Sequence, residues 1–158
     1  MTDAPQRIED SIFRTPAFEV LTIGVPFCVF KLLFGVLGVR IGTEQQSGLL
    51  ILGWLVITWA AVDLLMNLAR VFFQLVGRES PLEYCTIAQA GRLLKRSRLF
   101  LAIDTFLSFF IICFVLWSGW IVRLSQFESY LWYAATTLNL ISLAAVNIWL
   151  ELRRGPQV

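Results

Sequence analysis

The chain has 158 residues, of which 58% are hydrophobic and 14% aromatic, while only 15% are charged. This balance is far from that of a soluble globular domain and indicates an integral membrane protein. The net charge of +2 gives no indication of a nucleic-acid partner, and histidine, the usual haem ligand and commonest metal ligand, is absent. We therefore expect no cofactor, no metal site and no nucleic-acid partner.

Four long apolar runs predict the fold. Each reaches or exceeds the roughly 20 residues that an α-helix needs to cross a bilayer, and none alternates as a barrel strand does. We therefore expect an all-α integral membrane protein, a single domain over residues 1–158 with four transmembrane helices in a bundle. The runs lie at residues 17–39, 49–75, 99–122 and 130–150.

The first run contains two features that can shape a helix. Pro26 leaves the carbonyl of Thr22 without its N–H donor and can kink the helix. Gly38 and Gly42 form a GxxxG motif, which indicates either a close contact with another helix or a chance spacing. We expect the first run to stay in the protein as a membrane span, because it lacks a signal-peptide cleavage pattern.

The second run carries the stretch VDLLMNLAR, in which Asp63, Asn67 and Arg70 interrupt an otherwise apolar helix. At 100° per residue these side chains share one face, which should be directed at protein or water because burying a charge in lipid costs at least ~2.5 kcal/mol. Asp63 is the strongest candidate, since it lies about 21 Å from the outer start of the run. Alternatively, Arg70 extends to lipid headgroups and Asn67 only hydrogen-bonds between helices.

The segment between the second and third runs predicts a short amphipathic helix at about residues 81–98. Ser80, Pro81 and Glu83 have the spacing of an N-cap, a first helical residue and a capping box. This helix is expected either to lie on the inner leaflet or to extend the third span into the cytoplasm. Its basic side chains are expected to contact anionic lipid headgroups: Arg92, Lys95, Arg96 and Arg98.

Further polar side chains in the other runs predict a buried network. Asp104 lies about 8 Å into the third run, at a depth similar to Arg70, so we expect an ion pair between them. Alternatively, a basic residue of the preceding loop holds Asp104 at the interface. Asn139 contributes from a polar face of the fourth run. Lys31 lies nearer the outer end of the first run, so we expect no direct contact with Asp63; the alternative is a contact mediated by water.

Basic residues predict the orientation in the membrane. Nine Lys and Arg residues lie before the first run, between the second and third, and after the fourth, against two in the other connections. By the positive-inside rule both termini and the central linker are cytoplasmic. We expect the protein in a bacterial cytoplasmic (inner) membrane.

Two functions remain once enzymes are set aside, because the chain has no His cluster, no phosphate-binding glycine loop and no GxSxG. The first is an oligomeric ion or proton channel or transport component that uses the inner-leaflet polar cluster. The second is a non-conducting accessory or assembly subunit that docks on a larger membrane complex through its polar stripe. The expected cluster comprises Asp63, Asn67, Arg70, Asp104, Asn139 and Lys31.

Overall fold

The computed structural model describes residues 16–45, 47–78 and 80–154, and every regular element in those ranges is helical. Four helices are long and apolar enough to span a membrane, as expected of a helical integral membrane protein. The four predicted runs are therefore confirmed as helices, with ends shifted by a few residues. The candidate spans are Val20–Glu44, Gly48–Leu75, Ser97–Trp117 and Gln126–Trp149.

The first span is built from three consecutive helical segments. α2 (Pro16–Glu19) leads into a π-helical segment, η1 (Val20–Gly24), and α3 (Val25–Gln45) follows. Pro26 stands at the start of α3, and because proline has no N–H to donate, a carbonyl one turn earlier loses its usual partner. A local change of helix type is a common response to such a missing bond. The π-helical turn ends at Gly24, shortly before Pro26, and the kink expected at this proline stays a prediction.

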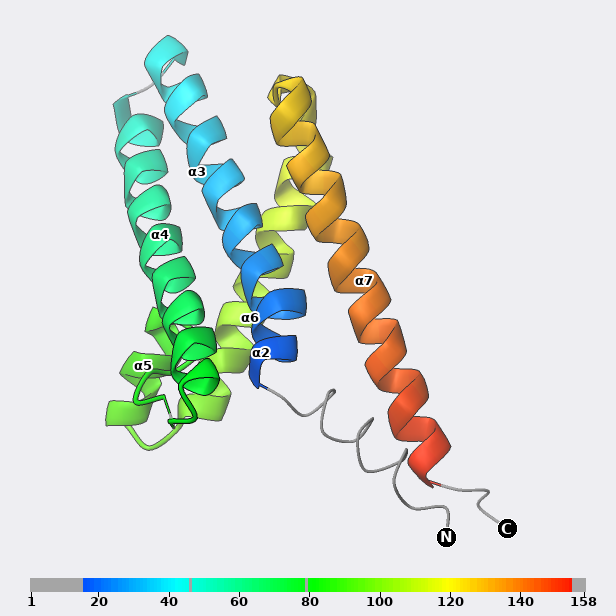
Figure 1. Ribbon diagram of the computed structural model, residues 1–158. Coiled ribbons are helices and arrows are strands. Elements are labelled where there is room, and N and C mark those ends of the chain that lie inside the picture. Colours follow the sequence, from blue (N-terminus) through cyan, green and yellow to red (C-terminus); the bar gives the residue numbers. More distant parts are fainter. Residues whose placement is uncertain (1–15, 46, 79, 155–158) are drawn as a thin grey trace, which may run out of the picture.

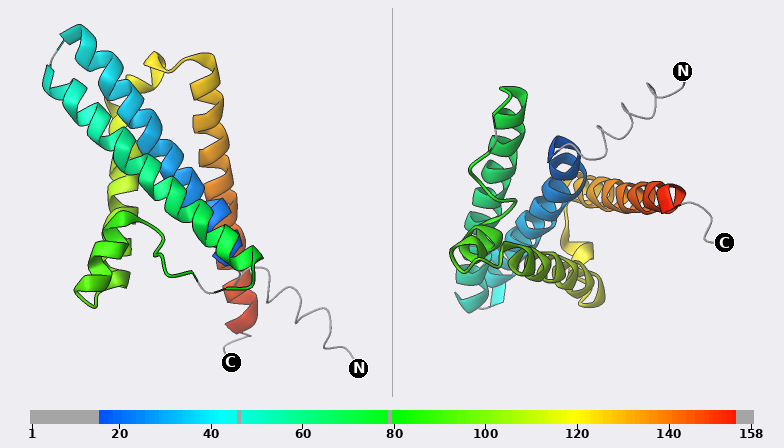
Figure 2. Two further views of the ribbon diagram at one scale, coloured as in Figure 1. Left: turned by 60° about the vertical axis from the view of Figure 1, so that its left-hand side comes forward. Right: turned by 90° about the horizontal axis from the view of Figure 1, so that it is seen from below.

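α3 and α4 (Ser47–Leu75) lie side by side along most of their length (Figures 1 and 2). Glycines make the close approach possible: a Cβ atom on Gly53 would lie 2.5 Å from a backbone nitrogen and 2.7 Å from a carbonyl oxygen of α3. Gly38 and Gly42 face α4 in the same way. The GxxxG motif therefore forms a helix–helix contact, since small residues allow backbones in membranes to approach closely.

α3 is the helix on which the other long helices pack. α4, α6 (Ser97–Trp117) and α7 (Gln126–Arg154) each contact α3, whereas across the described ranges they make few contacts with one another. The right-hand view of Figure 2 shows α3 lying between α4 and α7. The fold is therefore organised around α3.

Between α4 and α6 the chain forms a short helix, α5 (Thr86–Leu93), whose N-cap is Cys85. The predicted start of this helix at Pro81 is wrong. The Ser80 hydroxyl accepts a hydrogen bond from the backbone N–H of Leu82, 3.2 Å away, and so closes a tight turn instead of capping a helix. A serine hydroxyl can accept a backbone N–H in a turn as well as at a helix N-cap, so the spacing alone does not distinguish the two.

The predicted end of the linker helix at residue 98 is also wrong. Lys95 has a positive φ of 55° in a turn, and α6 begins only at Ser97. α5 packs against α6 through a close approach of Gly91 to Phe100. The linker helix is therefore a separate element and does not extend the third span.

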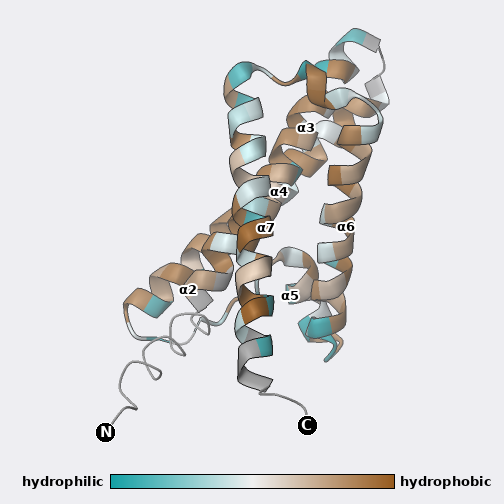
Figure 3. Ribbon diagram, turned by 90° about the vertical axis from the view of Figure 1, so that its right-hand side faces the viewer, coloured by the Kyte–Doolittle hydropathy of each residue, from teal (hydrophilic) through white to brown (hydrophobic). Residues whose placement is uncertain are grey.

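The two ends of the molecule differ in structure. The start of α2, the whole of α5 and the end of α7 lie at one end, which we call the α5 end (Figure 1). At the opposite end, the η2 end, the 3₁₀-helix η2 (Trp120–Arg123) connects α6 to α7, and Arg40 forms an ion pair with Glu128 at 2.8 Å. α7 is the least hydrophobic of the candidate spans, as its mixed colouring in Figure 3 shows.

A hydrophobic core lies mainly between α3, α6 and α7. Phe30 and Trp132 pack edge to face in it, with ring centroids 5.0 Å apart. Its members on α6 lie in the half of that helix toward the η2 end, whereas those on α3 extend from Phe27 to Leu37. The buried members are Phe27, Phe30, Leu33, Leu37, Ile111, Val115, Leu124, Trp132 and Ala135.

We predict that Gly53→Ala destabilises the protein by about 1–3 kcal/mol, the usual cost of overpacking a tight interface. The added methyl group would meet backbone atoms of α3, which cannot move aside as a flexible side chain can. Gly48→Ala is the control, because a Cβ atom there meets nothing within 4 Å. Thermal unfolding in detergent compares the two variants, and equal midpoints would show that α3 and α4 do not approach as closely as described.

Candidate functional site

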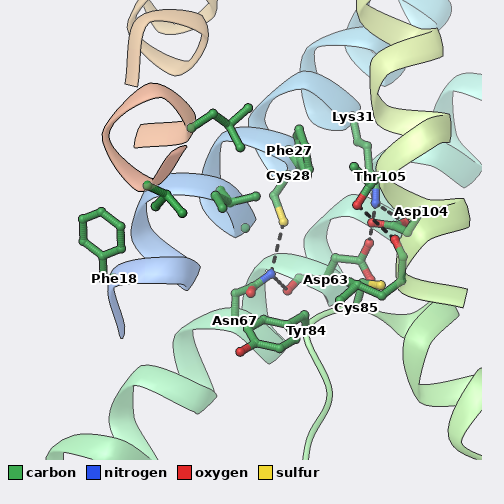
Figure 4. Close-up of a pocket in the computed structure, with 15 residues that line it drawn as sticks. Phe18, Phe27, Cys28, Lys31, Asp63, Asn67, Tyr84, Cys85, Asp104 and Thr105 are labelled. Atoms are coloured by element: carbon green, nitrogen blue, oxygen red, sulfur yellow. Dashed lines mark hydrogen bonds and ion pairs between the residues drawn. The ribbon is translucent and has the colours of Figure 1, made fainter. Parts of the chain in front are cut away.

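One basic and two acidic side chains, each from a different helix, meet in the protein interior (Figure 4). Lys31 Nζ of α3 lies 2.9 Å from Asp63 Oδ2 of α4 and 2.6 Å from Asp104 Oδ1 of α6. All three residues are buried, with exposed fractions of 1%, 1% and 4%. We call this cluster the triad. Its two carboxylates compensate the charge of the lysine ammonium, for which lipid chains provide no partner.

The expectation that Lys31 makes no direct contact with Asp63 is wrong. α3 continues to Gln45 and α4 begins at Ser47, so both helices reach further than their apolar runs indicate. Measured from that connection, Lys31 and Asp63 lie about 21 and 24 Å along their helices at 1.5 Å per residue. The two side chains are therefore at nearly the same level.

The linker is docked on the triad by the second oxygen of Asp63. Asp63 Oδ1 accepts hydrogen bonds from the Thr86 backbone N–H at 2.7 Å and from the Thr86 hydroxyl at 2.8 Å. Trp59 Nε1 donates to the same hydroxyl oxygen at 2.8 Å, and the Trp59 ring lies 4.2 Å from Lys31 Nζ. The first residue of α5 thus completes the coordination of a buried carboxylate.

The triad contains an excess of negative charge. Two carboxylates face one ammonium, so the fully ionised cluster carries one formal negative charge. An uncompensated charge is strongly disfavoured in a buried apolar environment. The cluster becomes neutral when it takes up one proton or one monovalent cation, and this exchange is the chemistry that the arrangement supports.

A cavity of about 340 Å³ lies beside the triad and extends toward the α5 end, where α2 and the linker line it. Its walls come from every long helix and are largely apolar, with Lys31, Asp63 and Asp104 among the polar lining residues (Figure 4). On the η2 side of the triad lie core residues of α3 and α6: Leu33, Leu37, Ile111 and Val115. The triad therefore has a cavity on one side and packed apolar side chains on the other.

Asn67 extends the polar wall from α4. Its Nδ2 donates to the Asp63 carbonyl oxygen at 2.9 Å and reaches Cys28 Sγ of α3 at 3.6 Å. Its Oδ1 is buried without a hydrogen-bond partner, although Asn67 lines the cavity. The interhelical hydrogen bond expected of Asn67 is thus present, and its Oδ1 remains without a donor.

The expected ion pair between Arg70 and Asp104 is wrong. Arg70 donates to the carbonyl oxygen of Leu82, and its guanidinium lies 3.8 Å from the ring centroid of Tyr84. It therefore holds the linker backbone, a partner that the spacing of side chains within helices does not indicate. The alternative of an interfacial Asp104 held by linker arginines is also wrong, because Asp104 is buried on Lys31.

The remaining predicted residues lie apart from the triad. Asn139 is buried on α7 but does not line the cavity, and its Nδ2 has no partner. The basic residues assigned to lipid headgroups are all exposed at the α5 end, and one of them donates to the Pro81 carbonyl oxygen at 2.7 Å. These residues are Arg92, Lys95, Arg96 and Arg98.

Sequence reasoning missed three members of the site: Trp59, Thr86 and Cys85. Trp59 could have been found, because it lies one turn before Asp63 on the same helical face. Thr86 could not, since its role depends on the fold of an irregular linker. Burial raises the pKa of the Cys85 thiol to about 12, and the nearby charge of Asp104 acts in the same direction.

Comparison of the chain with protein-family models, with curated proteins and with solved structures found no match.

We predict that Lys31 and Asp104 are energetically coupled. Lys31→Met leaves two buried carboxylates without their counter-charge and should cost about 3–5 kcal/mol. Combined with Asp104→Asn, the loss should be smaller than the sum of the single losses by about 1 kcal/mol or more. The free energy of unfolding in detergent is measured for the unchanged protein, the two single variants and the double variant. A second cycle, Arg70→Gln with Asp104→Asn, is the control and should be additive; additive losses in the first cycle would refute the direct ion pair.

We also predict that Cys85 resists alkylation at pH 8. Only the thiolate reacts, and a pKa near 12 keeps the thiol protonated well above that pH. Thr86→Val removes the hydroxyl that joins the linker to Asp63 and Trp59, so it should raise the labelling rate of Cys85. Peptide mass spectrometry after maleimide treatment reads this out. Thr58→Val, an exposed change on α4, should have no effect, and rapid labelling of the unchanged protein would show that Cys85 is not buried.

Proposed function

We propose that this protein is a proton- or ion-transport component in which the transported ion binds at the triad. The observation that carries this proposal is a buried carboxylate in excess of its counter-charge, placed beside a cavity. Buried ionisable groups in membrane spans are costly and commonly mark ion and proton pathways. A proton is the favoured ion, because protonating one carboxylate neutralises the triad without further ligands.

The cavity supports a pathway with access from one side. The cavity lies on the α5 side of the triad, and core residues Leu37, Ile111 and Val115 lie between the triad and the η2 end. Passage across the membrane then requires this core to open. We propose that it does so in a homo-oligomer or together with a membrane-protein partner, since one chain encloses no continuous polar path among its described residues.

Charge supports an orientation with the α5 end in the cytoplasm. Exposed basic residues are concentrated on and after α5, and basic residues retained on the cytoplasmic side are typical of membrane proteins. In this orientation Arg92, Lys95, Arg96 and Arg98 contact anionic lipid headgroups of a bacterial inner membrane. The triad is then loaded from the cytoplasm.

The alternative, a non-conducting accessory subunit, requires the polar stripe as a docking surface. The stripe residues Asp63 and Asn67 are instead buried against other helices of the same chain, as are Asp104 and Asn139. Their polar atoms are directed inward and are not available to a partner. This burial favours the transport proposal.

We predict that the purified protein in liposomes carries a proton flux when a pH gradient and a membrane potential are imposed, read by an enclosed pH dye. Asp104→Asn should lower the flux to that of empty liposomes, because the triad then has no excess carboxylate to protonate. Glu44→Gln is the matched control, a carboxylate of an exposed ion pair at the η2 end, and should leave the flux unchanged. A folded protein without flux, or an Asp104→Asn variant with full flux, would refute the proposal.

A further inference from the structure

We propose that the cavity beside the triad binds a lipophilic cation, a molecule with an apolar or aromatic body and a single positive charge. The inference rests on the proposed function in one respect: the triad has to exchange its proton with the α5 end for the cation to take its place.

The size and lining of the cavity fit a small organic molecule. Its volume of about 340 Å³ falls within the range of ligand pockets, which are mostly apolar with a few polar groups at defined positions. Side chains from α2, η1, α3, α6 and α7 supply the apolar surface. They include Phe18, Ile23, Phe27, Leu101, Leu143 and Val146.

The polar groups of the cavity determine the charge of the ligand. The ammonium of Lys31 is occupied by two carboxylates and the face of Trp59, so it offers little to an anion. The excess carboxylate and the unpartnered Oδ1 of Asn67 are both acceptors. A ligand that brings a positive charge, or a charged N–H group, therefore supplies what the site lacks.

Aromatic side chains add a second source of selectivity. Phe18 and Phe27 lie in the wall of the cavity and are labelled in Figure 4. The faces of aromatic rings attract organic cations and also pack against apolar substituents. An anion of the same shape would gain the packing but would meet the negative charge of the triad.

Cation binding and proton binding should exclude one another. Each neutralises the same single excess charge. A bound lipophilic cation therefore displaces the proton, and a bound proton lowers the affinity for the cation. The cavity and triad together would then form an exchange site for protons and hydrophobic cations. This relation assigns a substrate class to the proposed transport activity.

The test compares two hydrophobic ions of nearly the same shape and opposite charge. Purified protein in a mild detergent is titrated with tetraphenylphosphonium and, separately, with tetraphenylborate, and binding is followed by calorimetry. We expect the cation to bind about tenfold or more tightly than the anion, and to bind more weakly as the pH falls. Equal affinity for both ions, or cation binding that does not change with pH, would overturn the inference.

Two variants locate the binding. Leu143→Trp fills the cavity from α7 without altering the triad, and it should abolish cation binding. Ile141→Trp on the same helix is its control, because Ile141 is 63% exposed and lies outside the cavity. Asp104→Asn removes the excess charge and should lower the affinity for the cation by about tenfold or more. Undiminished binding in Leu143→Trp would place the cation outside this cavity and refute the proposal.

Failure of this inference is distinguishable from failure of the proposed function. Proton flux that depends on Asp104, with no tetraphenylphosphonium binding, would refute the cation site and leave proton transport in place. Specific cation binding in a protein without flux would refute the transport function and support a binding site alone.

Discussion

An ammonium group in the apolar interior of a membrane protein requires carboxylate partners, and Lys31 finds one on α4 and one on α6. These two ion pairs fix the level at which three helices meet. The second oxygen of Asp63 then accepts two hydrogen bonds from Thr86, which brings the linker and α5 into position. Three spans and the segment between two of them are thus arranged by the charge requirement of one side chain.

The central helix satisfies different requirements on different sides. Toward α4 its glycines allow close backbone contact, and toward α6 and α7 its aromatic and aliphatic side chains form the core. Lys31 lies where these regions meet the cavity. The interior is therefore asymmetric along α6, where cavity residues Leu101 and Thr105 lie toward the α5 end and core residues Ile111 and Val115 toward the η2 end. Such an asymmetry is what one-sided loading of an ion would need.

Composition and run length were sufficient to predict four apolar helices, because the bilayer imposes a minimum length on any span. Depth within the run was sufficient to identify Asp63 as buried. Contacts between side chains of different helices are harder to predict. The apolar run places Lys31 too near the outer end of its helix, because α3 continues through polar residues beyond Val39 and hydropathy does not mark that helix end. The partner of Arg70 is a backbone carbonyl in an irregular linker, and no side-chain pattern encodes it.

Proton transport as proposed requires that the triad hold one exchangeable proton. Infrared difference spectra of the membrane-embedded protein, recorded during a pH titration, report it through the C=O stretching band of a protonated carboxyl group. We predict such a band in the unchanged protein, its loss in Asp104→Asn and its persistence in Glu44→Gln. The absence of the band at every pH, or its survival in Asp104→Asn, would contradict the claim.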